Sequence, residues 1–108
     1  MDATYALVRQ AIAAKRPIVA IYDGHPRELC PHVIGTRDGR AQALCFQYGG
    51  SSGSGLPPGG DWRCLAIAGL TDVALVDGPW HTRGWNPAAQ HCVAHVDLAV
   101  ALDAADEA

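Results

Sequence analysis

The sequence predicts an α+β domain in which one N-terminal helix packs on a small antiparallel β-barrel. Apolar residues recur every three or four positions before Pro17, and short β-rich runs separated by glycine-containing turns follow it. The chain has 108 residues, of which 49% are hydrophobic, so it can bury one compact core. We therefore expect a single domain over residues 1–108.

The helix is expected at about residues 3–15. Thr4 or Asp2 can cap its start, and Pro17 stops the apolar pattern, because proline cannot continue a helix without losing a hydrogen bond. The residues that recur at helical spacing are Tyr5, Leu7, Val8, Ala11, Ile12 and Lys15.

A barrel of five strands is expected over about residues 18–77. Its turns contain Asp23-Gly24, Gly35, Asp38-Gly39 and Gly69, and Gly78-Pro79 ends the last strand. The expected strands are Ile18–Tyr22, Arg27–Ile34, Ala41–Tyr48, Trp62–Ile67 and Asp72–Val76.

A C-terminal extension is expected over about residues 78–108. Its first part, around Trp85, is expected to cross the domain irregularly, and Asn86-Pro87 favours a turn into a short helix from Ala88 to about His91. Beyond it, alternating apolar residues favour a strand while alanine richness favours a helix. We expect the strand first and fraying afterwards; the alternating residues are Val96, Leu98, Val100 and Leu102.

A Gly/Ser/Pro tract separates two of the expected strands, between Phe46 and Arg63. It is too long for a tight hairpin, and long ordered loops are usually functional. Leu56, Pro57 and Pro58 reduce the entropy that ordering the tract would cost. We expect this loop to lie ordered against the barrel, with Trp62 anchoring the strand that follows.

Several segments, in order, resemble the WYL domain family, especially its short stand-alone members. They are IAAKRP, IYDG, RELCPHVIG, GRAQALCFQYGG and WRCLAIAGLTDVALVDG, and the resemblance covers about residues 5–87. Gln42-Ala43-Leu44 replaces the tripeptide that names the family. The resemblance implies an SH3-like or Sm-like barrel.

The resemblance also implies a function: a non-catalytic sensor of a small anionic ligand, a nucleotide or a nucleic-acid fragment. The residues at matching positions are Tyr22, His32, Gln47 and Arg63. The alternatives are a half-buried strand tyrosine for Tyr22, a hydrogen-bonded structural histidine for His32 and a solvated strand arginine for Arg63. An arginine can hold a phosphate with two hydrogen bonds, and a tyrosine offers a stacking face and a hydroxyl. Arg27 and Arg40 can add positive charge. A role in transcription would require a separate DNA-binding partner.

Other functions follow less directly from the residues. The net charge of −3 gives no general attraction to nucleic acid. Open strand edges would suit a structural protein that self-associates into a homo-oligomer, which is the alternative function. His91 and His95 would share a helix face with Cys92 nearby, as a metal pair requires, and Cys30 and His32 could also point the same way. We expect the protein to bind no cofactor and no metal and to have no catalytic activity.

The cysteines are expected to be free thiols in a cytoplasmic protein. The first residues lack the basic start and apolar stretch of a signal peptide, and no run approaches the roughly 18 apolar residues of a membrane span. A reducing compartment keeps thiols unpaired. We therefore expect all four to be unbridged: Cys30, Cys45, Cys64 and Cys92.

Overall fold

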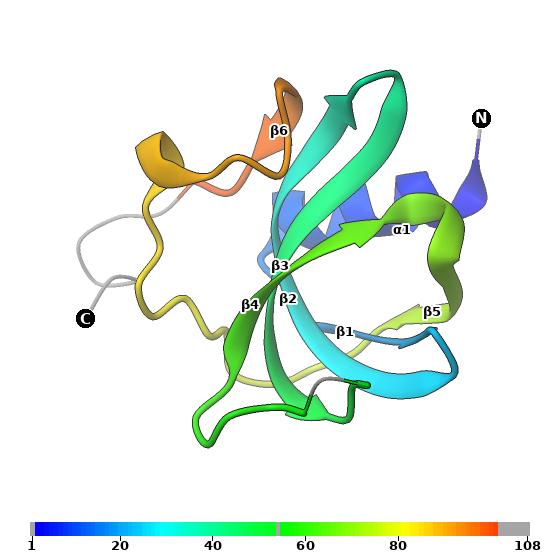
Figure 1. Cartoon of the computed structure of the whole chain (residues 1–108), viewed down its shortest axis with the longest axis vertical. Helices are drawn as coiled ribbons and strands as arrows, with labels where there is room; N and C mark the ends of the chain where they lie inside the picture. Colours follow the sequence, from blue (N-terminus) through cyan, green and yellow to red (C-terminus); the bar gives the residue numbers. More distant parts are fainter. Residues whose placement is uncertain (1, 54, 102–108) are drawn as a thin grey trace.

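A computed structural model describes residues 2–53 and 55–101 and confirms the α+β class (Figure 1). The helix α1 lies against one face of a single antiparallel sheet, and two short 3₁₀ turns interrupt the later chain. The elements are α1 (Ala3–Ala14), β1 (Ile18–Tyr22), β2 (His25–Arg37), β3 (Arg40–Gly50), β4 (Asp61–Ala66), η1 (Ile67–Gly69), β5 (Leu70–Leu75), η2 (Pro87–Ala89) and β6 (His95–Ala99).

The sheet has six strands in the described residues and is curled but open. Its order is β4-β3-β2-β1-β5, and β6 pairs with β2. Both β1 and β6 can pair with β2 because β2 is long: its first half pairs with β1 and its second half with β6. The five expected strands are present, but together with β6 they form an open sheet, and the described residues do not close it into a barrel. The chain passes from β4 through η1 straight into β5, so these strands form opposite edges of the sheet rather than a closing pair.

The helix forms where its spacing and capping predict. The Asp2 carboxylate accepts the backbone N–H of Thr4 (2.9 Å), and the chain leaves the helix at Lys15 in a left-handed conformation (φ 51°). Tyr5 donates its hydroxyl hydrogen to the Asp97 carboxylate (2.6 Å), and Arg9 pairs with the same oxygen (3.1 Å). These contacts fix α1 to β6.

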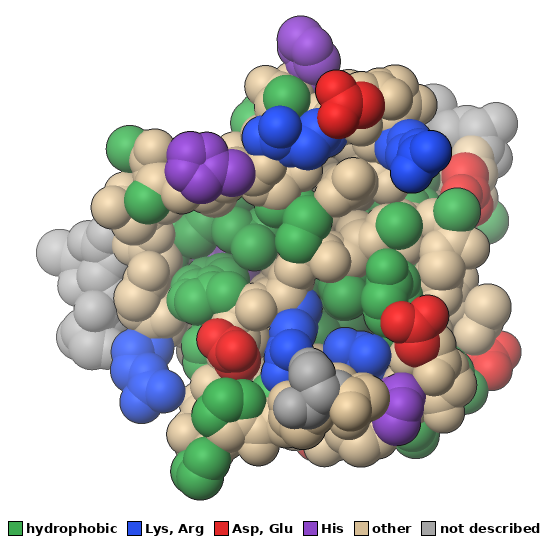
Figure 2. Space-filling view, viewed as in Figure 1, with side chains coloured by type: hydrophobic (Ala, Val, Ile, Leu, Met, Phe, Trp, Pro, Cys, Tyr) green, Lys and Arg blue, Asp and Glu red, His purple; other side chains and the backbone are tan. Residues whose placement is uncertain are grey.

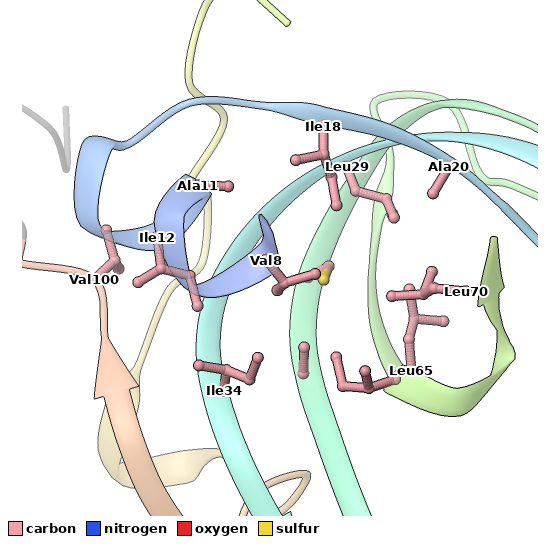
Figure 3. Packing of buried hydrophobic residues seen from close by; sticks show 13 residues of the cluster. Val8, Ala11, Ile12, Ile18, Ala20, Leu29, Ile34, Leu65, Leu70 and Val100 are labelled. Carbon is pink, nitrogen blue, oxygen red and sulfur yellow. The ribbon is translucent and has the colours of Figure 1, made fainter. Parts of the chain in front are cut away.

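The main core lies between α1 and the inner, concave face of the sheet (Figure 3). Side chains from the helix point towards those of the first two strands and towards Leu65 and Leu70. Complete burial of a residue of this kind contributes about 1.5–3 kcal/mol. Fully or nearly fully buried members include Val8, Ala11, Ile12, Ile18, Leu29, Ile34, Ala43, Cys45, Leu65 and Ile67.

The chain between β5 and β6 covers part of the opposite, outer face of the sheet. It contributes Trp85, Cys92 and Val93 to a second cluster that includes Val33 of β2. Its helical portion is only the 3₁₀ turn η2, shorter than the expected helix from Ala88 to His91. The strand expected after it is confirmed as β6, although Leu102 and the fraying expected after the strand lie outside the described residues.

A disulfide joins Cys64 of β4 to Cys92, with the two Cα atoms 5.5 Å apart. The expectation that these two thiols are free is therefore wrong. Twenty-eight positions separate them, and only the passage of the later chain across the outer face brings them together. Cys30 and Cys45 are free and buried, and burial raises the pKa of the Cys30 thiol to about 11. Disulfides are rare in the cytoplasm, so a cytoplasmic location stays a prediction.

Candidate functional site

Three of the four residues predicted to bind a ligand lie on the inner face of the sheet. Arg63 pairs with Cys45, whose side chain belongs to the main core, and Gln47 follows Cys45 by two positions on β3. Alternation along a strand therefore places Arg63 and Gln47 on the core side. Tyr22 packs against the same core, and its hydroxyl accepts the Ala66 N–H (3.2 Å).

Arg27 connects two of these residues and is itself buried, with 6% of its surface exposed. Its Nη1 donates to the Gln47 side-chain oxygen (3.2 Å), and its Nη2 donates to the Tyr22 carbonyl (3.4 Å). The guanidinium carbon lies 5.1 Å from the centre of the Tyr22 ring, a cation–π distance. The Gln47 amide nitrogen donates to the carbonyls of Gly49 and Ser51 (both 3.0 Å), which fixes its orientation.

Among the described residues, the groups that accept hydrogen bonds from the Arg27 guanidinium are neutral. Within residues 2–53 and 55–101, Arg27 forms no ion pair with a carboxylate, and its Nε has no hydrogen-bond partner. A buried charge without a counterion is costly, because neutral acceptors replace only part of its hydration. Arg27 is therefore a buried cation that is held in place but paired with no carboxylate of the described residues.

The glycine-rich loop lies beside this site. Arg63 Nη2 donates to the Gly55 carbonyl (2.7 Å), and a cavity of about 410 Å³ is lined by Gly55, Leu56, Pro57, Asp61 and Arg63. Arg27 lines a separate cavity, together with Glu28 and Asp72. In Figure 2, basic side chains gather near the lower centre of the view, next to hydrophobic ones.

Further hydrogen bonds attach the described part of the loop to the domain. The Ser51 N–H donates to the Pro26 carbonyl (2.9 Å), and Arg83 donates to the Gly59 carbonyl (3.3 Å). The tract is thus fastened at its start and near its end. The expectation of an ordered loop also includes Ser54, which lies outside the described residues.

His32, the fourth predicted residue, lies on the outer face, away from the other three. Pro31 pairs with Cys45 but Val33 pairs with Leu44, so β2 has one extra residue at this point. Such a bulge reverses the alternation of side chains. Alternation from the inward residue Leu29 already places His32 on the outer face, and the bulge keeps the next residue, Val33, on that face as well.

The environment of His32 is an aromatic cluster. Its ring lies 4.7 Å from Trp62, 4.8 Å from Trp80 and 5.1 Å from Trp85, between ring centres, and the side chain has no exposed surface. Nδ1 donates to the Cys30 carbonyl (2.7 Å), which leaves Nε2 of the neutral ring to accept the Thr82 hydroxyl (2.9 Å). Burial lowers the pKa of His32 to about 4. It is a neutral, structural histidine at pH values near 7.

The sequence pointed to Arg27 only as a source of extra charge. Its position two residues before the buried Leu29 indicates an inward side chain, but the Gln47 contact depends on the pairing of β2 with β3. Arg40, the other proposed addition, pairs with Arg37 in the β2–β3 hairpin, at the far end of β3 from Gln47. It does not join the site.

The alternative metal site loses the geometry on which it depended. His95 begins a strand, so it shares no helix with His91, and Cys92 is bonded to Cys64. The described part of the chain contains no group of three or more His, Cys, Asp or Glu side chains that could hold a metal ion. The same described residues contain no helix of the length and apolarity that spanning a membrane requires.

Comparisons with protein-family models, with curated proteins and with solved structures found no match. The resemblance to WYL domains therefore stays a prediction. The case for a function depends on the geometry described above.

Proposed function

We propose that this chain is a non-catalytic binding module for a small anion, held at the inner face by Arg27 and Arg63. The observation that carries the proposal is Arg27, a buried guanidinium with an unpartnered Nε and no paired carboxylate among the described residues. An anion would supply the missing counterion through charge-assisted hydrogen bonds, which are roughly twice as strong as neutral ones.

Neighbouring groups support a site prepared for such a ligand. Gln47 orients Arg27, and the loop carbonyl of Gly55 orients Arg63, so neither guanidinium must be ordered from a free state on binding. Binding without chemistry is proposed because the groups that gather here are guanidiniums, an amide, the Asp61 carboxylate and a tyrosine hydroxyl that already accepts the Ala66 N–H, and these described groups include no hydrogen-bonded pair of nucleophile and base.

Charge favours a small anion over a nucleic-acid strand. Asp61 lines the same cavity as Arg63, and the chain as a whole has a net charge of −3. Both would repel a ligand that extends many phosphates across the surface. A single phosphate or carboxylate group needs only the two guanidiniums.

The test is isothermal titration of the whole chain with inorganic phosphate, a nucleoside monophosphate and a short single-stranded oligonucleotide at equal ionic strength. We expect saturable phosphate binding that weakens about tenfold, near 1.4 kcal/mol, in Arg63→Gln and disappears in Arg27→Met. Arg40→Gln is the matched control, since it removes the same charge from the far end of β3.

Two results would contradict the proposal: no saturable binding of any anion to the native chain, or equal weakening in the Arg63 and Arg40 variants. Circular dichroism of each variant separates loss of binding from loss of the fold. Tighter binding of the oligonucleotide than of the monophosphate would replace the small anion by a nucleic-acid fragment.

A second candidate function is self-association through the sheet edges. The open order of the sheet leaves β4 and β5 as edge strands, and unpaired backbone groups on an edge can pair with another copy. Light scattering over a range of concentrations tests this, with a concentration-dependent dimer as the supporting result and a monomer throughout as the opposing one.

A further inference from the structure

A second cavity, of about 240 Å³, lies on the outer face and is not used by the proposed function. Leu44 and Trp62 line it from the sheet, at positions that alternate with the inward residues Cys45 and Arg63. The chain between β5 and β6 forms the opposite wall. The full lining is Leu44, Trp62, Gly84, Trp85, Asn86, Ala89, Gln90 and His91.

The aromatic walls of this cavity are held in place before any ligand arrives. Trp62 and Trp85 lie 5.6 Å apart between ring centres, tilted by 34°, and both pack against the buried His32. Trp62 Nε1 donates to the Arg83 carbonyl (3.1 Å), which fixes the edge of its ring. Rigid aromatic surfaces bind flat rings with little loss of conformational entropy.

The polar groups at the cavity restrict the chemistry of a ligand. The described residues that line the cavity include His91 but no Lys, Arg, Asp or Glu. The Gln90 amide is occupied on both sides by the backbone of Val93 (2.8 and 2.9 Å). The Asn86 side-chain oxygen accepts the Ala88 N–H (3.1 Å). The NH₂ group of Asn86 has no acceptor among the described residues, so it can donate to a ligand.

We infer that this cavity binds an uncharged planar heteroaromatic ring with a hydrogen-bond acceptor on its edge. The ring would lie against Trp62 and Trp85, and its acceptor would meet the Asn86 NH₂ group. A volume below the roughly 300–1,000 Å³ of drug-sized pockets suits one or two fused rings.

The disulfide contributes to this site by joining its two walls. Cys64 follows Trp62 by two positions on the same face of β4, and Cys92 directly follows the lining residue His91. The covalent bond therefore fixes the segment that includes Trp85 at a set distance from the sheet. Without the bond, the walls would be held by weaker contacts, and binding of a ring would weaken.

The experiment is an NMR titration of the whole chain with indole and with benzimidazole, a bicycle of the same shape that has an added ring acceptor. The three tryptophans each give a side-chain N–H signal. We expect saturable shifts at Trp62 and Trp85, with a smaller change at Trp80, which does not line the cavity. Benzimidazole should bind more tightly, and Asn86→Asp, which keeps the oxygen that accepts from Ala88, should abolish that preference.

Paired variants on η2 test whether the ring enters the cavity. Ala88 and Ala89 are both exposed, but only Ala89 lines it. Ala89→Phe should weaken binding at least about tenfold, and Ala88→Phe should leave it unchanged. The double variant Cys64→Ser/Cys92→Ser should also bind more weakly.

The inference would be overturned by linear, unsaturable shifts, by equal shifts at all three tryptophans, or by equal effects of the two alanine variants. Titration of phosphate into the same sample tests the proposed anion site on the inner face and not the cavity on the outer face. Failure of one site is therefore distinguishable from failure of the other.

Discussion

Protonation of His32 should be a main cause of acid destabilisation in this protein. The ring is fully buried among three tryptophans, and burial lowers its pKa to about 4 from the ordinary 6.5. The unfolded chain therefore binds a proton at His32 as the pH falls below about 6.5, while the folded chain stays neutral there until about pH 4. Between these values, each proton taken up favours unfolding.

The size of the effect follows from the shift in pKa. A lowering from 6.5 to about 4 corresponds to a loss of about 3 kcal/mol in the free energy of unfolding. This loss is complete near pH 4 and absent above about pH 7. It is a large share of the 5–15 kcal/mol that typically stabilises a domain.

Urea denaturation followed by tryptophan fluorescence measures this loss, because the tryptophans that surround His32 change environment on unfolding. The His32→Asn variant keeps a donor for the Cys30 carbonyl but has no ring to protonate. It should be less stable than the native chain near pH 7, and the difference should shrink by about 3 kcal/mol as the pH falls to 4.

Thr82→Val tests the cause of the shift. It removes the hydroxyl that donates to His32, at a cost of about 1 kcal/mol, but keeps the ring buried, so the pH dependence should persist. Parallel pH profiles for the native chain and His32→Asn would refute the reasoning. So would an NMR titration of the native ring that gives a pKa near 6.5, a measurement that does not require any variant to fold.

Three further predictions concern the folded chain. Replacing Cys64 and Cys92 by serine should lower the free energy of unfolding by about 3–4 kcal/mol, since the bond closes a long loop in the unfolded chain; chemical denaturation measures it. Gly35→Ala should cost more than about 2 kcal/mol and expose β6 to hydrogen exchange, because a Cβ there would collide with the His95 carbonyl. Replacing residues 51–60 by a two-residue turn should leave the melting temperature nearly unchanged but abolish phosphate binding.

Each of these predictions has an outcome that opposes it. Serine variants as stable as the native chain would contradict the argument that the bond stabilises the fold by restricting the unfolded chain. Gly53→Ala is the control for Gly35→Ala, since its Cβ would meet only a distant ring atom of His25 (3.8 Å), and equal losses would argue against a steric cause. Unchanged phosphate binding after loop replacement would make the tract a mere connection.

Local patterns in the sequence were enough to predict the elements. The helix, the five early strands and the strand after Ala94 all occur near their expected places, because spacing, capping and turn residues act over a few positions. The expected start of β2 at Arg27 was late by two residues, and Pro26 in the strand explains why, since proline usually marks its boundary. Closure of the sheet depends on pairing between distant strands, which local patterns do not encode.

The contrast between local patterns and long-range pairing also explains which parts of the candidate site the sequence could predict. Gln47 and Arg63 come out on one face because strand alternation is a local property. His32 does not join them because it lies an odd number of positions from the inward residues Arg27 and Leu29, so the same alternation places it on the outer face. The Cys64–Cys92 bond, by contrast, depends on a crossing of the outer face by a chain with little regular structure.

The strand β4 is the element on which both proposed sites depend. Arg63 faces the inner side with its guanidinium bonded to the loop, while Trp62 and Cys64, one position to either side, face the outer cavity and its disulfide. A shift of one residue in the pairing of β3 with β4 would exchange these faces and bury Trp62 against Cys45. The core residue Leu65 opposes such a shift, because it would leave the core and expose its side chain. Packing of the core thus fixes the register that gives the two faces their different chemistry.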